Sequence, residues 1–191
     1  MSNKRVDIPK TDRLQSVVLS GHVITQRLKD DGTFPNNGEL PLLIYQSALA
    51  LPQRNPPALV EDLFASNGWN RSWRNGIFGF HHYHSTAHEV LGVYSGFAKV
   101  QLGGENGIIQ TIRCGDVVVI PAGVAHKNLG DGDNFRVVGA YPSGQSPDMC
   151  YGKSGERPRA DGHIAGVSLP PMDPVYGISG ELMGHWGIPV L

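Results

Sequence analysis

The feature that most restricts the fold of this chain is a group of metal-binding residue types between residues 76 and 128. His82 and His84 are two residues apart, so on a β-strand both imidazoles would leave the same face. Glu89 follows after an interval in which the chain can turn back, and His126 comes after a buried-strand pattern and a Pro-x-Gly turn. Several short strands must bring these groups together around one divalent ion, so the spacing favours a small β-barrel.

Short apolar segments separated by turn residues extend this pattern over most of the chain's second third. Their near-regular spacing is typical of an all-β sandwich or barrel. Glycine-containing pairs such as Ser-Gly, Gly-Gly and Asn-Gly mark the turns between them. We expect strands at Ile77–His84, His88–Tyr94, Phe97–Leu102, Gly107–Ile112, Asp116–Ile120, Ala125–Leu129 and Phe135–Tyr141.

The first of these predicted strands would form one wall of the site. Phe78, Phe80, His82 and His84 have the same parity, so a strand would place an aromatic floor and two ligands in one interior. His81 has the opposite parity and would point away from that interior.

Five histidines remain outside this ligand set. His81 and His88 lie beside the ligands in sequence, and we expect them at the surface or in roles that support the ligands. The remaining three, His22, His163 and His185, are expected to be ordinary exposed side chains.

Two motifs in this region resemble those of the cupin superfamily. The second motif departs from the family pattern at Gly130, where Asn is usual. The amino-acid sequence around both motifs is similar to that of the YjlB-like branch of bacterial single-domain cupins. The matched positions are Gly76, His82, His84, Glu89 and Gly96 in the first motif, and Gly115, Pro121, Gly123 and His126 in the second.

The resemblance implies an all-β, cupin-type double-stranded β-helix, or jelly-roll barrel, that holds one divalent transition metal ion. The ligands would be His82, His84, Glu89 and His126. Three imidazoles and a carboxylate suit Fe, Mn, Ni, Co, Zn or Cu and disfavour Ca and Mg. Around a six-coordinate ion this set leaves two positions for water, O2 or a chelating substrate.

Three functions are compatible with such a site. The leading hypothesis is a small-molecule metalloenzyme of dioxygenase type, because Phe78 and Phe80 would make the pocket apolar beside the metal. The alternative is a metal-dependent sugar or keto-acid isomerase, which would need a general base although Glu89 is already committed to the metal. The third is a non-catalytic module that binds metal and metabolite, since one fold hosts many functions.

The length of 191 residues suits a single domain over residues 1–191. We expect the barrel core at about 75–142, an N-terminal extension at 1–74 and an extended C-terminal arm at 143–191 that packs on the barrel or on a partner.

Within the extension, residues 41–48 predict a wrapping strand. A short helix is expected to follow Asn55 as N-cap, with Pro56 in its first turn and Gly68 at its end. The run Val117–Ile120 has no polar face, so it predicts a strand covered on both sides, by the wrapping strand or by a second subunit.

The composition of the chain limits the classes of binding partner that we expect. A formal net charge of −1 and a pI near 6.7 give no basic surface for nucleic acid or for an anionic membrane. The first residues lack the apolar segment of a signal peptide, so we expect a cytoplasmic protein. We also expect a homodimer that binds a small molecule, with Trp69 or Trp186 as an aromatic anchor of the interface.

Overall fold

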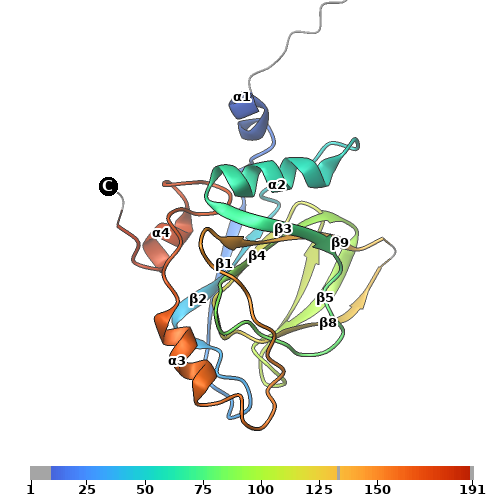
Figure 1. Ribbon diagram of the computed structural model, residues 1–191. Helices are drawn as coiled ribbons and strands as arrows, with labels where there is room; N and C mark the ends of the chain where they lie inside the picture. The colour runs from blue at the N-terminus through green and yellow to red at the C-terminus, as the bar shows by residue number, and fades with distance from the viewer. Residues whose placement is uncertain (1–9, 133, 190–191) are drawn as a thin grey trace, which may run out of the picture.

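A computed structural model describes residues 10–132 and 134–189. In this part of the chain nine strands form two antiparallel sheets that curve around a common interior, with short helices outside them (Figure 1). The strands are β1 (His22–Leu28), β2 (Asn37–Gln46), β3 (Trp69–Asn75), β4 (Glu89–Ser95), β5 (Phe97–Leu102), β6 (Ile108–Arg113), β7 (Val117–Ile120), β8 (His126–Asp131) and β9 (Arg136–Pro142). The helices are α1 (Lys10–Gln15), α2 (Pro56–Ser66), α3 (Arg159–Gly166) and α4 (Glu181–His185).

The larger sheet has the strand order β1-β2-β7-β4-β9-β3, and the smaller sheet has the order β6-β5-β8. Neighbours in both sheets pair antiparallel, as in a jelly roll. The N-terminal segment supplies both edges of the larger sheet, β1 with β2 at one side and β3 at the other. This sheet therefore includes strands from outside residues 75–142. The predicted all-β jelly-roll architecture is confirmed.

Strand β7 lies between two apolar layers of the same chain. Val118 and Ile120 face the interior between the sheets, where they meet side chains of β2, β4 and β5. Val117 and Val119 face outward into a second cluster with buried residues of α2 and α4. The strand is covered on both faces, as its composition predicts, and the outer cover is α2 and α4 rather than a second subunit.

The expected dimer anchors are both buried inside the chain. Trp69 is fully buried, and its indole N–H donates to the Met172 carbonyl at 2.9 Å. Trp186 of the C-terminal arm donates to the Pro41 carbonyl at the same distance. Neither indole is presented to a partner, so these two side chains do not support the expected interface. Residues 143–189 instead form short helices and loops along the barrel (Figure 1).

The first predicted strand of the barrel is wrong. The segment 77–84 is irregular and has only isolated bridges at His82 and Tyr83, whereas the regular strand before it is β3 at Trp69–Asn75. Strand β3 was missed because its sequence, WNRSWRN, is polar, as suits a mostly exposed edge strand. Phe78 and Phe80 consequently do not form a buried floor, since they are 45% and 47% exposed.

The other six predicted barrel strands are confirmed with boundaries within two residues. The predicted helix is also present as α2, and its apolar residues are buried. Asn55 precedes it in a left-handed conformation, φ 53°, but its side chain makes no capping hydrogen bond. No helix among the described residues is long and apolar enough to cross a membrane.

Candidate metal centre

The three candidate histidines come from two segments that are bonded to each other. His82 and His84 belong to the loop between β3 and β4, and His126 begins β8. The backbones of His82 and His126 bond reciprocally, with N···O distances of 3.2 Å and 2.9 Å. The His84 carbonyl accepts a hydrogen bond from Gly123 N at 2.8 Å. Gly123 has φ 92°, and a Cβ there would meet the Asn36 carbonyl oxygen at 2.4 Å, so this turn requires glycine.

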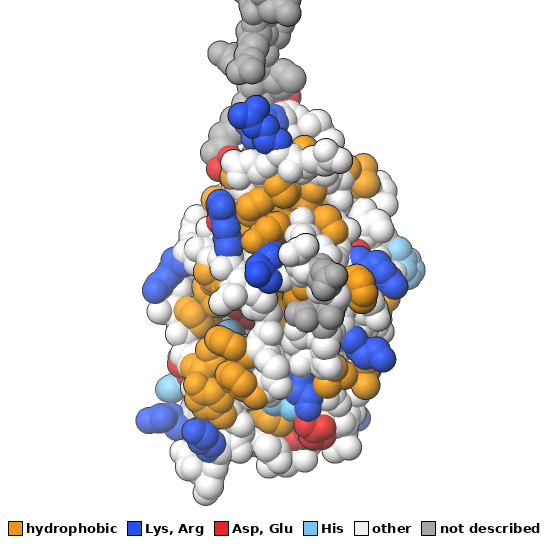
Figure 2. All heavy atoms as spheres, turned by 90° about the vertical axis from the view of Figure 1, so that its right-hand side faces the viewer, with side chains coloured by type: hydrophobic (Ala, Val, Ile, Leu, Met, Phe, Trp, Pro, Cys, Tyr) orange, Lys and Arg blue, Asp and Glu red, His pale blue; other side chains and the backbone are white. Residues whose placement is uncertain are grey.

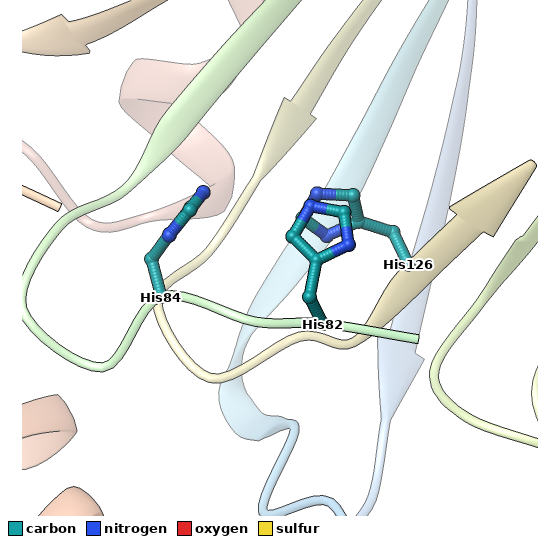
Figure 3. A group of neighbouring side chains, drawn as sticks. All are labelled: His82, His84 and His126. Atoms are coloured by element: carbon teal, nitrogen blue, oxygen red, sulfur yellow. The ribbon is translucent and has the colours of Figure 1, made fainter. Parts of the chain in front are cut away.

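The imidazoles of His82, His84 and His126 are buried and converge on one point (Figure 3). One ring nitrogen from each lies within 4.8 Å of the other two. The ring centroids of His82 and His126 are 4.1 Å apart, and His84 stands about 6 Å from both. The structure thus brings together the three histidines that the sequence predicts, and they are positioned for a metal ion.

A backbone carbonyl sets the ring orientation of each histidine. The Nδ1 atom of His82 lies 3.2 Å from the Phe80 oxygen, and that of His84 lies 2.5 Å from the Asp148 oxygen. His126 repeats the pattern, with Nδ1 3.2 Å from a carbonyl oxygen two residues earlier. Because a carbonyl oxygen can only accept, each Nδ1 carries the proton and donates it. The Nε2 atoms are then available as ligands.

Glu89, the first residue of β4, places its carboxylate beside these rings. Its Oε2 atom lies 3.5 Å from Nε2 of His84 and 3.3 Å from Nε2 of His126. Its Oε1 atom is buried without a hydrogen-bond partner in the described part of the chain. A buried carboxylate oxygen that lacks a donor is costly unless another group compensates it, and a cation at the three nitrogens would do so. These residues therefore fit a divalent metal ion.

Burial and charge set the protonation of the site. Burial lowers the pKa of His82 to about 3, with a further contribution from His126, so this ring is neutral. Burial also acts to lower the pKa of His84, but the Glu89 carboxylate outweighs it and raises the value. Burial acts to raise the pKa of Glu89, and the two neighbouring imidazoles reverse this and hold it below its usual range. Glu89 is thus a carboxylate, the form that binds a cation.

A cavity of about 330 Å³ opens from the histidines to the surface. Its apolar wall includes Ile77, Leu91 and Trp73, and Phe78 and Met149 stand at its mouth. The cavity size is at the lower end of the range for small-molecule sites. The arrangement can therefore admit one small molecule to the convergent nitrogen atoms.

Two residues of the cavity wall were not predicted. Tyr141 is the last but one residue of β9 and lies near Glu89, and its hydroxyl accepts a hydrogen bond from the Trp73 indole at 2.9 Å. Burial and the nearby Glu89 charge raise the pKa of Tyr141, so the phenol stays protonated. Tyr141 was missed because it appears in the sequence only as the last apolar residue of a strand. The Trp73 partner lies on the unpredicted strand β3.

A hydrogen-bonded group next to His84 was also not predicted from the sequence. The carboxylate of Asp148 accepts from the Ser85 backbone N at 2.6 Å and from the Ser85 hydroxyl at 2.5 Å. Ser85 Oγ lies 3.0 Å from Nδ1 of His163 in α3. His163 is exposed, as the sequence predicts, and its contact with Ser85 was not predicted. No sequence signal links residues that are more than sixty positions apart.

The remaining histidines lie outside the metal group, as predicted. His81 is mostly buried and faces Glu105, with Nε2 3.3 Å from its carboxylate. His88 is buried, and its Nδ1 accepts from the backbone N of Ala122 at 2.9 Å. His22 is exposed, and His185 lies 3.6 Å from Glu181 in the same helix.

Comparison with known proteins places this barrel and its histidines in a family. A family model described as cupin matches residues 71–145. The uncharacterized protein YjlB of Bacillus subtilis (strain 168) is 43% identical over 157 residues, which cover 82% of this chain and 92% of that protein. The chain therefore belongs to the cupin family. Within it, the chain is a YjlB-like cupin.

The solved structures that match this chain have lower sequence identity to it. A vicilin from Solanum lycopersicum (tomato) is 20% identical with a TM-score of 0.36, and the match covers 66% of this chain and 32% of that one, so the chain spans about a third of the vicilin. A putative mannose-6-phosphate isomerase from Ralstonia eutropha JMP134 is 17% identical with a TM-score of 0.29, covering 75% of this chain and 97% of that one. Similarity at this level carries no information on substrate.

Proposed function

We propose that the protein is a metal-dependent enzyme that acts on a small molecule by oxidation, in the manner of a dioxygenase. One observation carries the proposal. Three buried histidines bring one ring nitrogen each to within 4.8 Å of the others, beside Glu89 and in the wall of a largely apolar cavity. A bound divalent transition metal would supply Lewis acidity and, if redox-active, a site for O2 activation.

Different residues of this chain would have different roles in the reaction. His82, His84, Glu89 and His126 would hold the ion, with each histidine fixed by its Nδ1–H bond to a carbonyl. The apolar wall would exclude water from a bound substrate. Tyr141 would present a protonated hydroxyl beside the carboxylate.

An isomerase is the second candidate, and Tyr141 is the observation that favours it. Isomerisation next to a carbonyl needs a group that moves a proton, and the hydroxyl of Tyr141 is an ionisable group in the cavity wall besides Glu89 and the histidines. Its raised pKa makes it a proton donor rather than a base at neutral pH. The oxidative proposal is preferred because the described residues that line the cavity include no evident base besides the proposed metal ligands.

A measurement of turnover would distinguish the three candidate functions. Protein loaded with Fe, Mn, Ni, Co, Zn or Cu would be incubated with diols, β-diketones, thiols and keto-sugars while O2 and products are followed. O2 uptake that depends on substrate and is lost in His84→Ala supports the oxidative proposal. Interconversion of keto-sugars without O2 uptake supports the isomerase, and saturable binding without product supports a binding module.

The homodimer, the cytoplasmic location and the lack of a nucleic-acid partner stay predictions. Symmetric dimers are the commonest soluble oligomers, which supports the homodimer. Light scattering tests it directly, because a mass near 20.6 kDa would show a monomer.

A further inference from the structure

We infer that the cavity takes a flat aromatic molecule that carries two adjacent oxygen donors and no phosphate. The inference rests on the proposed metal site and names the substrate class for it. Its basis is a group of exposed apolar side chains, here called the aromatic rim, which consists of Phe78, Phe80, Met149 and Tyr151. Phe78 and Met149 line the cavity, and Phe80 and Tyr151 continue the group outside it.

The aromatic rim is continuous with the histidines. Phe78 and Phe80 stack with ring centroids 4.9 Å apart and an interplanar angle of 14°. Both rings contact His82, at 5.2 Å and 5.8 Å between centroids. Tyr151 extends the rim beyond Phe80 at 5.9 Å. A molecule that enters the cavity toward the histidines therefore meets Phe78, whose ring stacks on that of Phe80.

The exposure of the aromatic rim suggests that a ligand binds there. Phe78 and Phe80 remain nearly half exposed although they adjoin a buried ligand residue. Figure 2 shows hydrophobic side chains gathered in patches on one face, with histidine atoms visible between them. Apolar patches of this kind commonly mark binding sites. Aromatic side chains prefer aromatic partners in offset or edge-on arrangements, so a planar ring is the matching occupant.

The charges of the wall argue against a phosphate or sugar phosphate. Arg74 is the one Lys or Arg among the described residues that line the cavity. Its guanidinium is held by both carboxylate oxygens of Glu61, each at 2.6 Å. Arg71 acts electrostatically on Tyr141 but does not line the cavity. A ligand with a dianionic group would find no free cation in this wall apart from the metal.

The cavity also limits the size and the polar end of the ligand. A volume of about 330 Å³ suits a body of one or two rings. Four protein ligands around a six-coordinate ion would leave two positions, so the donor end would offer two adjacent oxygens.

The test uses hydroxamic acids, which share one chelating group with two adjacent oxygens and differ only in their body. Zn-loaded full-length protein is titrated with benzohydroxamic, cyclohexanecarbohydroxamic and acetohydroxamic acid, and with glucose 6-phosphate. Zn is chosen because it has no redox chemistry. The variants are Phe78→Ala, Phe80→Ala and the control Ile109→Ala, which removes a 53% exposed side chain of β6.

We expect benzohydroxamic acid to bind at least tenfold tighter than acetohydroxamic acid, and several-fold tighter than the saturated ring. Each Phe variant should lose roughly 2- to 13-fold in affinity for the aromatic probe alone, the effect of one aromatic contact. Zinc content is measured in every variant so that affinities are compared per bound ion, and the ratio of the affinities for benzohydroxamic and acetohydroxamic acid should fall by this factor in each Phe variant. Ile109→Ala should behave as the wild type.

Other outcomes overturn the inference. Equal binding of the aromatic and saturated rings, tighter binding of glucose 6-phosphate, or Phe variants without effect would each contradict it while the proposed metal site stands. Wild-type protein that takes up no zinc would remove the proposed metal site itself, and the inference with it. If the Phe variants turn a dimer into a monomer without changing probe affinity, the rim is an interface between two copies of this chain.

Discussion

The backbone carbonyl oxygen of Asp148 lies 2.5 Å from Nδ1 of His84. This contact joins the segment after β9 to a candidate metal ligand in the loop before β4. The Asp148 side chain strengthens the same junction through Ser85. The C-terminal segment thus fixes the ring orientation of His84, and this relationship can be tested apart from the ligands themselves.

Asp148→Ala should weaken metal binding about 10- to 100-fold, the usual effect of losing a group that orients a ligand. The reason is that the Ser85 turn loses its acceptor and the Asp148 carbonyl no longer holds its position. Zinc affinity is measured by competition with a chromophoric chelator at a temperature where circular dichroism shows folded protein. Asp161→Ala, which removes a carboxylate paired with Arg157 instead, should bind zinc like the wild type. Equal affinities in both variants would show that Asp148 does not orient His84.

Metal affinity should fall as the pH is lowered. The Glu89 carboxylate raises the pKa of His84 above its ordinary value, so a proton on His84 competes with the metal at and above about pH 6.5. Below that pKa the affinity should drop about tenfold per pH unit for each displaced proton. His82 adds nothing in this range, because its pKa is near 3.

Glu89→Gln provides the matched variant for this pH dependence. Without the carboxylate charge the pKa of His84 falls, so the loss of affinity should begin at a lower pH, although the affinity itself is weaker. Zinc affinity between about pH 5.5 and pH 8.5 is the measurement. A profile that is flat, or unshifted in Glu89→Gln, would mean that other groups bind the metal.

Leu63→Ala should lower the free energy of unfolding by about 2–5 kcal/mol, because Leu63 is a fully buried residue of α2 in the cluster that covers β7. Urea denaturation measures the change. Leu169→Ala, at a position that is 41% exposed, should change the free energy by less than about 0.5 kcal/mol. A similarly small loss for Leu63→Ala would show that α2 is not part of the core.

Much of the barrel is predictable from the sequence because its strands alternate or are uniformly apolar between glycine turns. Strand β7, with four consecutive buried residues, is an example, and its position follows from composition alone. The metal group is predictable for a similar reason. The spacing of His82 and His84, and the turn before His126, leave few ways to arrange three imidazoles in a barrel.

Apart from the polar edge strand β3, the failures have one physical origin, since they depend on contacts between distant segments. Period-two alternation at Phe78 to His84 suggests a strand, but the backbone of this segment forms scattered hydrogen bonds to β8 and Cys150 rather than a continuous ladder. The Asp148 and His163 contacts join the C-terminal segment to the Ser85 turn. The pattern of Val117–Ile120 shows that a cover is required and cannot show that α2 supplies it.

Elemental analysis of untagged protein after reconstitution tests the metal site most directly. We predict about one divalent transition metal ion per chain in the wild type, and loss of that ion in the double variant His82→Ala/His126→Ala. The control His22→Ala/His185→Ala, which removes two histidines outside the group, should retain the metal. Full occupancy in His82→Ala/His126→Ala, or no metal in the wild type, would contradict the assignment of the site.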